Sequence, residues 1–323
     1  MAIFEELQPL IDRVQDQLQK SVKDEFPSTL KEPIYYFLES PGKKIRPLLT
    51  LLSCEAIGGQ YEDALHAAVG IELFHDFTLI HDDIMDQDDL RRGRYTVHKK
   101  WGEESAILVG DALIGLAYEK MMECKPQYLS TVIRLFNEAL LKVCEGQALD
   151  KEFEDMQHVD LNDYLNMISK KTAWLFKLSC QIGAILGGGS QDRVKLMTQF
   201  GYFLGMGFQI QDDLLDYMGE ENTLGKKIGS DLKMDKKTYI TLKYREHILK
   251  NNDLISKYPQ TLTQYNEIKK VQNALNELGI VRETQNVVNQ YIENALDLLK
   301  SVQPLTEENK LLRMVLSLQK RQY

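Results

Sequence analysis

Proline is unevenly distributed in this chain. All eight prolines of the 323 residues stand outside positions 127–258. Because a proline inside a helix costs about 3 kcal/mol, such a tract favours uninterrupted helices. Apolar residues recur at spacings of three and four, as on one face of a helix, and alternating runs between Asn-Gly or Asp-Gly turns do not occur. We therefore predict an all-α fold in a single domain, residues 1–323. The periodic segments are 4–18, 65–84, 107–121, 129–149, 164–186, 194–217, 265–278 and 285–299.

The composition argues against several functional classes. The net charge is −9 at pH 7 and the isoelectric point is about 5.3, unlike a protein that binds nucleic acid or an anionic membrane by bulk attraction. The four cysteines are scattered without a Cys-x-x-Cys pair, as expected in a reducing compartment. The N-terminal segment is acidic and amphipathic, unlike a signal peptide. The longest uncharged apolar stretch, 178–189, is shorter than the roughly 20 residues of a membrane span. We expect a cytoplasmic protein.

Two of the apolar helices carry the same acidic pattern, Asp-Asp-x-x-Asp, at 82–86 and 212–216. The first and last aspartates of each stand one turn apart, where like charges destabilise an isolated helix by about 0.2–0.5 kcal/mol. A cation would offset that repulsion, and carboxylates without histidine or cysteine suit Mg²⁺, which bridges carboxylates to phosphates. A solvated helix end is the alternative for one pattern alone, and a carboxylate acid–base pair is possible, but six aspartates suit metal ligation better. We predict a magnesium site.

Basic residues accompany both acidic patterns although the chain is acidic overall. Arginine presents a fork to phosphate oxygens and lysine a point charge, so cations beside a metal site indicate a polyanion held from two sides. The Gly-x-x-x-x-Gly-Lys-Ser/Thr loop of many nucleotide sites is absent. The inferred ligands are diphosphates, two of them. The basic residues lie within 43–46, 91–92, 170–171, 226–227 and 236–237.

Six motifs occur in the order found in one family of enzymes. Their combination is specific, whereas either aspartate motif alone would not be. Over nearly its whole length the chain resembles the trans-isoprenyl diphosphate synthase (polyprenyl synthetase) family, in particular its short-chain farnesyl and geranylgeranyl diphosphate synthases. The motifs are G-K-K-I-R-P at 42–47, H-D-D-I-M-D-Q-D-D-L-R-R-G at 81–93, K-T-A at 171–173, F-Q-I-Q-D-D-L-L-D at 208–216, L-G-K at 224–226 and G-S-D-L at 229–232.

The resemblance implies a helical bundle around a deep central cavity, usually as a homodimer. It also implies a prenyltransferase that condenses isopentenyl diphosphate with an allylic diphosphate (dimethylallyl, geranyl or farnesyl) to a short all-trans prenyl diphosphate. Mg²⁺, up to three ions on the allylic diphosphate, would neutralise the leaving group so that the allylic C–O bond ionises. The released diphosphate would then take up the proton, so that no side chain need act as a general base.

Matching the motifs residue by residue assigns three groups of site residues. Those that match metal ligands are Asp82, Asp86 and Asp212, supported by Asp83, Asp213 and Asp216. Those that match positions holding isopentenyl diphosphate are Lys43, Arg46, His75 and Arg92. Those that match positions around the allylic diphosphate are Arg91, Lys171, Thr172, Gln209, Lys226 and Lys236. Lys236 departs from the family, which has Gly-Lys where this chain has Asp-Lys, and a hydrogen-bonded core histidine is the alternative for His75.

The residues before the first aspartate motif bear on product length. Phe77 stands five residues before Asp82, about 7–8 Å along a helix that rises about 1.5 Å per residue. In similar enzymes a bulky residue here closes the floor of the cavity, so Phe77 with Phe74 predicts a short product. Thr78 is small, which favours C20 over C15. The alternative is that both aromatic rings pack against a neighbouring helix.

Two other functions compete with this interpretation. A class I terpene cyclase shares the helical fold and one aspartate-rich motif, but it has a different second metal motif and lacks the cations for a second diphosphate. The present chain has the second Asp-Asp-x-x-Asp together with Lys43, Arg46 and Arg92. A non-catalytic subunit of a heteromeric prenyl synthase usually loses aspartates, and here both motifs are intact.

Overall fold

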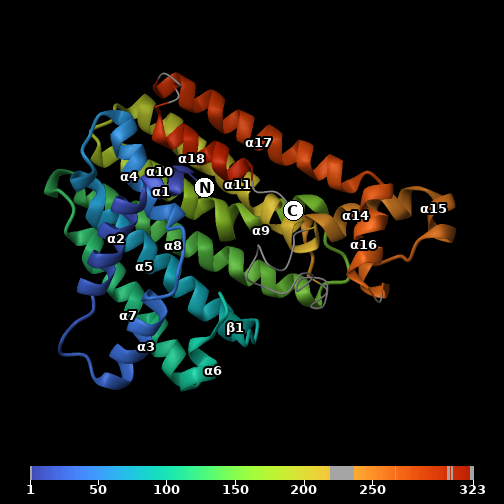
Figure 1. Ribbon diagram of the computed structural model, residues 1–323, viewed down its shortest axis with the longest axis horizontal. Helices are drawn as coiled ribbons and strands as arrows, with labels where there is room; N and C mark the ends of the chain where they lie inside the picture. Colours follow the sequence, from blue (N-terminus) through green and yellow to red (C-terminus); the bar gives the residue numbers. More distant parts are fainter. Residues whose placement is uncertain (1, 219–235, 266, 304–305, 307, 321–323) are drawn as a thin grey trace. The chain divides into compact units, whose positions relative to one another are not determined.

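Nearly all regular structure in this protein is helical (Figure 1). The computed structural model describes residues 2–218, 236–265, 267–303, 306 and 308–320. The all-α prediction is confirmed. The elements are α1 (Ala2–Glu6), α2 (Gln8–Lys20), α3 (Ser28–Leu38), α4 (Ile45–Ile57), α5 (Tyr61–Met85), β1 (Leu90–Arg91), β2 (Arg94–Tyr95), α6 (Val97–Trp101), α7 (Glu103–Met122), α8 (Pro126–Asp155), α9 (Leu161–Ile168), the π-turn η1 (Ser169–Ala173), α10 (Trp174–Leu186), α11 (Gln191–Met218), α14 (Tyr239–Lys250), α15 (Asn252–Lys257), the 3₁₀ turn η2 (Leu262–Gln264), α16 (Ile268–Glu277), α17 (Ile280–Val302) and α18 (Lys310–Gln319).

The chain divides into two compact units, each built from three separate stretches of sequence. Unit 1 contains 1–139, 175–201 and 298–317, and unit 2 contains 140–174, 202–297 and 318–323. The prediction of a single domain over 1–323 stays a prediction. Of the described helices, none combines the length and the apolar character that a membrane crossing requires.

Unit 1 is organised around α5, which packs against α4 and α7. Most of the first fourteen residues of α5 are buried and apolar, so this helix forms a core on several sides at once. Arg193 donates hydrogen bonds to the carbonyl oxygens of Ala56, Ile57 and Val302 at 3.0–3.2 Å. These acceptors lie at the ends of α4 and α17, where helices leave carbonyl groups unpaired. One guanidinium thus joins three parts of the sequence within unit 1.

The core of unit 2 holds the end of α11, the helix that carries the second aspartate motif. Leu214 and Tyr217 are fully buried in a cluster with side chains of α14, η2 and α16. The Tyr217 carbonyl accepts a hydrogen bond from Gln272 at 3.0 Å, and the Tyr244 hydroxyl donates to the Pro259 carbonyl at 2.8 Å. The cluster and the Gln272 contact hold the last turns of α11.

Two local features were not anticipated from the sequence. Just after the first aspartate motif, β1 and β2 form a short antiparallel pair in which Leu90 faces Tyr95 and Arg91 faces Arg94. The periodic segment 164–186 is interrupted by η1, a single π-turn. Neither feature has a periodic signature, because each spans only a few residues.

Candidate active site

The first aspartate motif occupies the last turn of α5. Asp82 and Asp86 are half-buried, and the Asp86 amide donates to the Asp82 carbonyl at 2.8 Å. Asp83 is 1% exposed and faces Arg91, whose Nε and Nη2 lie 2.7 and 2.6 Å from its Oδ1. A two-contact pair of this kind fixes both side chains more strongly than a single contact. Arg91, predicted to bind the allylic diphosphate, is thus held against α5 by Asp83.

The turn between β1 and β2 directs Arg91 and Arg92 to different places. Arg92 and Gly93 have φ values of 52° and 76°, the left-handed region that reverses the chain within two residues. The Arg92 guanidinium reaches the segment before α4, where a Cβ on Gly42 would stand 2.9 Å from its Nη1. A side chain at position 42 would therefore require the Arg92 guanidinium to move. Lys43 follows directly.

Of the residues predicted for isopentenyl diphosphate, Arg46 meets His75 of α5, while the Lys43 ammonium lies over the Phe4 ring at 5.5 Å. Arg46 lies 3.0 Å from His75 Nε2 and stacks on the Phe176 ring at 5.0 Å. Burial lowers the pKa of His75 well below its usual range, and the positive charge of Arg46 lowers it further. The imidazole is therefore neutral, and its Nε2 accepts a hydrogen bond from Arg46. His75 is thus a hydrogen-bonded histidine that orients Arg46. Its place in the isopentenyl diphosphate site stays a prediction.

The donor set of the first motif fits magnesium. Asp82 and Asp86 offer only oxygen ligands from one helical face, with Asp83 behind them engaged by Arg91. In the described part of the chain no three acidic, histidine or cysteine side chains gather into a closed metal cage. An ion bound here must complete its coordination from water or phosphate oxygens, as Mg²⁺ commonly does.

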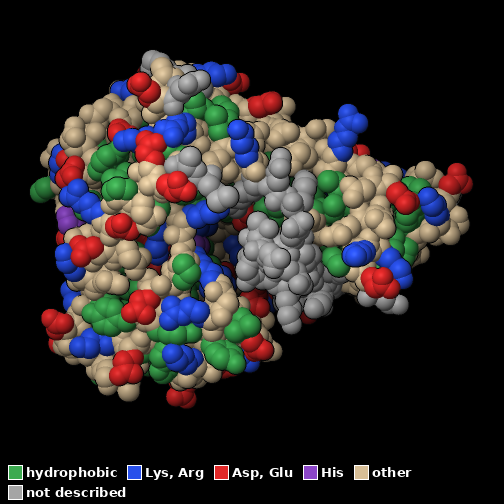
Figure 2. Space-filling view, in the orientation of Figure 1, with side chains coloured by type: hydrophobic (Ala, Val, Ile, Leu, Met, Phe, Trp, Pro, Cys, Tyr) green, Lys and Arg blue, Asp and Glu red, His purple; other side chains and the backbone are tan. Residues whose placement is uncertain are grey.

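Charge on the surface is mixed rather than gathered. In the face shown in Figure 2, Lys and Arg side chains are interspersed with Asp and Glu. The described part of that face carries no field of one sign.

In unit 2, Asp213 of the second motif is the centre of a hydrogen-bond network. It is 5% exposed and accepts hydrogen bonds from the Tyr164 hydroxyl, from Gln209 Nε2 at 2.9 Å and from the Tyr239 amide at 3.0 Å. Burial raises the pKa of Asp213 to about 6, against the lowering effect of these three donors. Gln209 Oε1 in turn accepts from the Thr172 hydroxyl at 2.8 Å. Asp213 is therefore a support for its neighbours Asp212 and Asp216, which are half-buried.

The π-turn η1 presents Lys171 and Thr172. Lys171 pairs with Asp150 at 2.6 Å, and a Cβ on Gly146 would lie 2.3 Å from the Lys171 backbone nitrogen. Gly146 thus lets α8 approach the backbone of η1. Single π-turns inside helices often occur at functional sites, and this one contains the Lys-Thr-Ala motif.

Two predicted residues are not part of these networks. Lys226 lies outside the described residues. Lys236 is half-buried, and its carbonyl accepts from the Thr238 amide and the Thr241 hydroxyl at the start of α14. The role of Lys236 toward a diphosphate stays a prediction.

The sequence of the protein matches that of known enzymes. A family model described as polyprenyl synthetase matches residues 27–278. The chain belongs to the polyprenyl synthetase family. Like its family, it is a prenyltransferase.

Relatives and solved structures cover from about three quarters to nearly all of the chain. It is 36% identical to a geranylgeranyl diphosphate synthase of Methanosarcina mazei over 98% of this chain and 99% of the relative. It is 41% identical to a short chain isoprenyl diphosphate synthase of Methanothermobacter thermautotrophicus over 76% of each. A crystal structure of a geranylgeranyl pyrophosphate synthetase from Pyrococcus horikoshii, 31% identical, matches with a TM-score of 0.88 over 99% of both chains.

Several residues of this polyprenyl synthetase site were missed by sequence reasoning. Tyr164 and Asp150 hold Asp213 and Lys171 from other helices, and no spacing within either motif points to them. Glu72 and Asp76 are buried carboxylates on α5, and their signal was available as acidic residues inside an apolar run.

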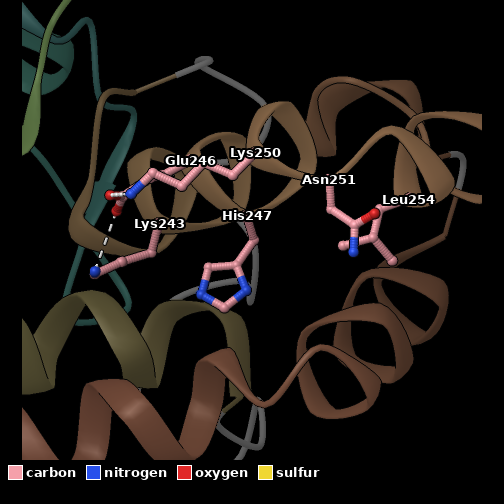
Figure 3. A pocket seen from close by; sticks show the side chains of 6 residues that line it. All are labelled: Lys243, Glu246, His247, Lys250, Asn251 and Leu254. Carbon is pink, nitrogen blue, oxygen red and sulfur yellow. Dashed lines mark hydrogen bonds and ion pairs between the residues drawn. The ribbon is translucent and has the colours of Figure 1, made fainter.

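A small pocket in unit 2 does not include any predicted site residue (Figure 3). Glu246 pairs with Lys243 at 3.1 Å and also with Lys250, and His247 lies 3.1 Å from Glu283. These charged groups therefore already have partners. The pocket is lined by Lys243, Glu246, His247, Lys250, Asn251 and Leu254.

Proposed function

We propose that this prenyltransferase condenses isopentenyl diphosphate with an allylic diphosphate and releases a short all-trans prenyl diphosphate, with C20 favoured over C15. The observation that carries this proposal is the convergence of Arg46, His75 and Arg92 beside α5 in unit 1. These residues could bind a diphosphate without a metal ion, and the neighbouring aspartate motif could bind Mg²⁺. Relatives named geranylgeranyl diphosphate synthase support C20. Two others are named geranylfarnesyl diphosphate synthase, so C25 is the alternative product.

Asp82 and Asp86 in unit 1 would hold Mg²⁺, and so would Asp212 in unit 2; the resemblance implies up to three ions. Bound there, the metal supplies Lewis-acid neutralisation of the leaving diphosphate, so that the allylic C–O bond ionises. The chain contributes the fixed geometry of the carboxylates. Asp83 pairs with Arg91, and Asp213 accepts hydrogen bonds from three donors. These contacts hold the helical turns that carry the neighbouring carboxylates.

Thr172 and Gln209 would face the allylic cation as oriented dipoles. The amide nitrogen of Gln209 is committed to Asp213, which leaves its oxygen to accept from Thr172. Oxygen dipoles fixed in this way stabilise positive charge without the reorganisation that water would need. In unit 2, Lys171, held by Asp150 at 2.6 Å, would exchange its carboxylate partner for the diphosphate. In unit 1, Arg91 would stay on Asp83 and bind a phosphate through its remaining N–H groups.

Product length would be limited by Phe77. Phe74 is fully buried and packs edge-on against Phe136 at 5.3 Å between ring centres, so it is a core residue that supports its neighbour. Phe77 is half-buried and lies 6.3 Å from Phe74. The Thr78 hydroxyl donates to the His75 carbonyl at 2.7 Å, which turns its polar atom back to the helix. We therefore assign the floor to Phe77.

A homodimer would use α7. Ile107 and Leu108 are 46% and 60% exposed, and Gly115, two turns further along, has nothing within 4 Å of an added Cβ. Large apolar side chains beside a small residue favour close contact with another helix. The test is the molar mass in solution: Leu108→Glu is expected to shift a dimer to monomer, and a monomeric wild type would contradict the assignment.

The proposed reaction is tested by a product assay. Purified protein with Mg²⁺ and isopentenyl diphosphate is incubated with dimethylallyl, geranyl or farnesyl diphosphate, and products are read by mass spectrometry with an EDTA control. We expect a metal-dependent product that ends at C20. No elongation with any primer would favour a non-catalytic subunit, and a cyclic hydrocarbon from a preformed prenyl diphosphate would favour a terpene cyclase.

A further inference from the structure

A buried group of charges lies behind the residues proposed for isopentenyl diphosphate. Lys44 and Glu72 form an ion pair at 3.1 Å in which both side chains are 4% exposed. Asp76, one turn further along α5, is 2% exposed. Buried ionisable groups are rare unless they are paired or have work to do. None of these three residues contacts the substrate in the proposed function.

The Lys44–Glu72 pair shapes the turn that presents the basic residues. Lys44 has a left-handed backbone, with φ and ψ of 46°, and is the residue before α4. Lys43 precedes this turn and Arg46 lies in the first turn of the helix. Because a non-glycine residue rarely adopts this backbone unaided, the buried pair explains why the turn is held. Glu72 therefore has Lys44 as its ion-pair partner. Asp76 is the second buried carboxylate of this group.

Asp76 is influenced by three cations and one carboxylate. Lys44 and Arg46, at the start of α4, and Arg92, in the turn after β1, each attract its carboxylate electrostatically. Its Oδ2 accepts no hydrogen bond from any residue in the described ranges. Burial raises the pKa of Asp76 to about 7, against the attraction of these three cations and with the repulsion of Glu72. The neighbouring His75 is neutral, so the balance is set by these groups.

Binding of a diphosphate would change this balance in one direction. A multiply charged anion on Arg46 and Arg92 offsets their attraction for the Asp76 carboxylate and repels that carboxylate through a low-dielectric interior. Both effects favour the neutral acid. Since linkage is reciprocal, protonation of Asp76 must also strengthen diphosphate binding by the same factor.

We propose that Asp76 takes up a proton from solvent when isopentenyl diphosphate binds at Arg46 and Arg92, and so sets the positive charge that the site offers to its substrate. The carboxylate and the incoming proton form a carboxylic acid, and no other bond changes. Asp76 is a positioning residue that acts through the two arginines. The inference rests on the proposed function, because it requires isopentenyl diphosphate at this site.

The test is calorimetric titration of the full chain with isopentenyl diphosphate, without added metal, in two buffers of different ionisation enthalpy. At about pH 7.5, slightly above the midpoint of Asp76, the wild type is expected to take up more protons than Asp76→Asn by a sizeable fraction of one per site. The substrate's own titration contributes equally to both proteins. Asp192→Asn, an exposed change in the first turn of α11, is the matched control and should equal wild type.

The dissociation constant gives a second readout. If binding raises the pKa of Asp76 by one unit, the wild-type constant weakens up to about tenfold as pH rises through neutrality, and Asp76→Asn loses that component. Infrared difference spectra of the wild type should also gain a carboxylic-acid band on binding, which needs no variant to fold. Equal proton counts in wild type and Asp76→Asn, or no such band, would overturn the inference alone. Failure of the wild type to bind isopentenyl diphosphate would overturn the proposed function with it.

Discussion

The hydroxyl of Tyr164 offers a sharp test of how the second aspartate motif is held. Tyr164→Phe removes one of three donors to the buried Asp213 and leaves the ring in place. A hydrogen bond to a charged group contributes about 1.5–3 kcal/mol. Because Gln209 and the Tyr239 amide still donate at 2.9 and 3.0 Å, we expect the lower part of that range, about 2 kcal/mol, or a roughly thirtyfold change in the folding equilibrium.

The assay is urea unfolding at neutral pH, read as a lower midpoint at unchanged slope, together with a titration of activity against Mg²⁺. Loss of an outer partner of a metal site typically costs about 10–100-fold in metal affinity or activity. Because Tyr164 acts on Asp213, which supports the proposed ligand Asp212, we expect the lower end, a rise of about tenfold in the Mg²⁺ requirement. Tyr118→Phe removes the same atom from an exposed, neutral contact with Asn137 at 2.9 Å and should cost under about 1 kcal/mol. Equal losses in the two variants would refute the reasoning.

Three further changes have defined outcomes. Asp76→Asn should unfold less readily than wild type, because the raised pKa of about 7 means that wild type loses stability as pH rises from about 4 to about 7; unfolding by urea at both ends of that window measures it, and a constant difference would contradict it. Gly146→Ala should push the Lys171 backbone away from α8 at a cost of about 1–3 kcal/mol and should lower kcat; a kcat equal to that of the wild type would show that the position of η1 does not matter for the reaction. Phe77→Ala should lengthen the products by at least one isoprene unit in a mass-spectrometric assay, and an unchanged length would remove Phe77 from the floor.

The helices could be predicted because their signals are local. The absence of proline from 127–258 and the apolar spacing within each segment report on neighbouring residues in the chain. The membership of each helix in unit 1 or unit 2 is not local, since it depends on stretches more than a hundred residues apart. Sequence pattern alone has no access to that pairing.

The candidate site shows the same division. The motifs identified Arg91 and Asp83 as site residues, but only the turn at Arg92 shows that the two pair with each other. Lys171 was identified as a ligand, while Asp150, its partner, is 21 residues away on another helix. Residue types in a motif predict chemistry, whereas the groups that orient them come from packing.

The interleaved composition of unit 1 has a consequence for the order of events during synthesis. Its first stretch ends at residue 139 and its last at 317. At about 5–20 residues per second, the ribosome needs roughly 10–35 s to add residues 140–317. During that interval α5 is present, while the carbonyl of Val302 that Arg193 binds does not yet exist. Unit 1 therefore completes late in translation. Its helices α4, α5 and α7 can pack against one another early, but the contact between Arg193 and the end of α17 forms only after residue 302 has been added.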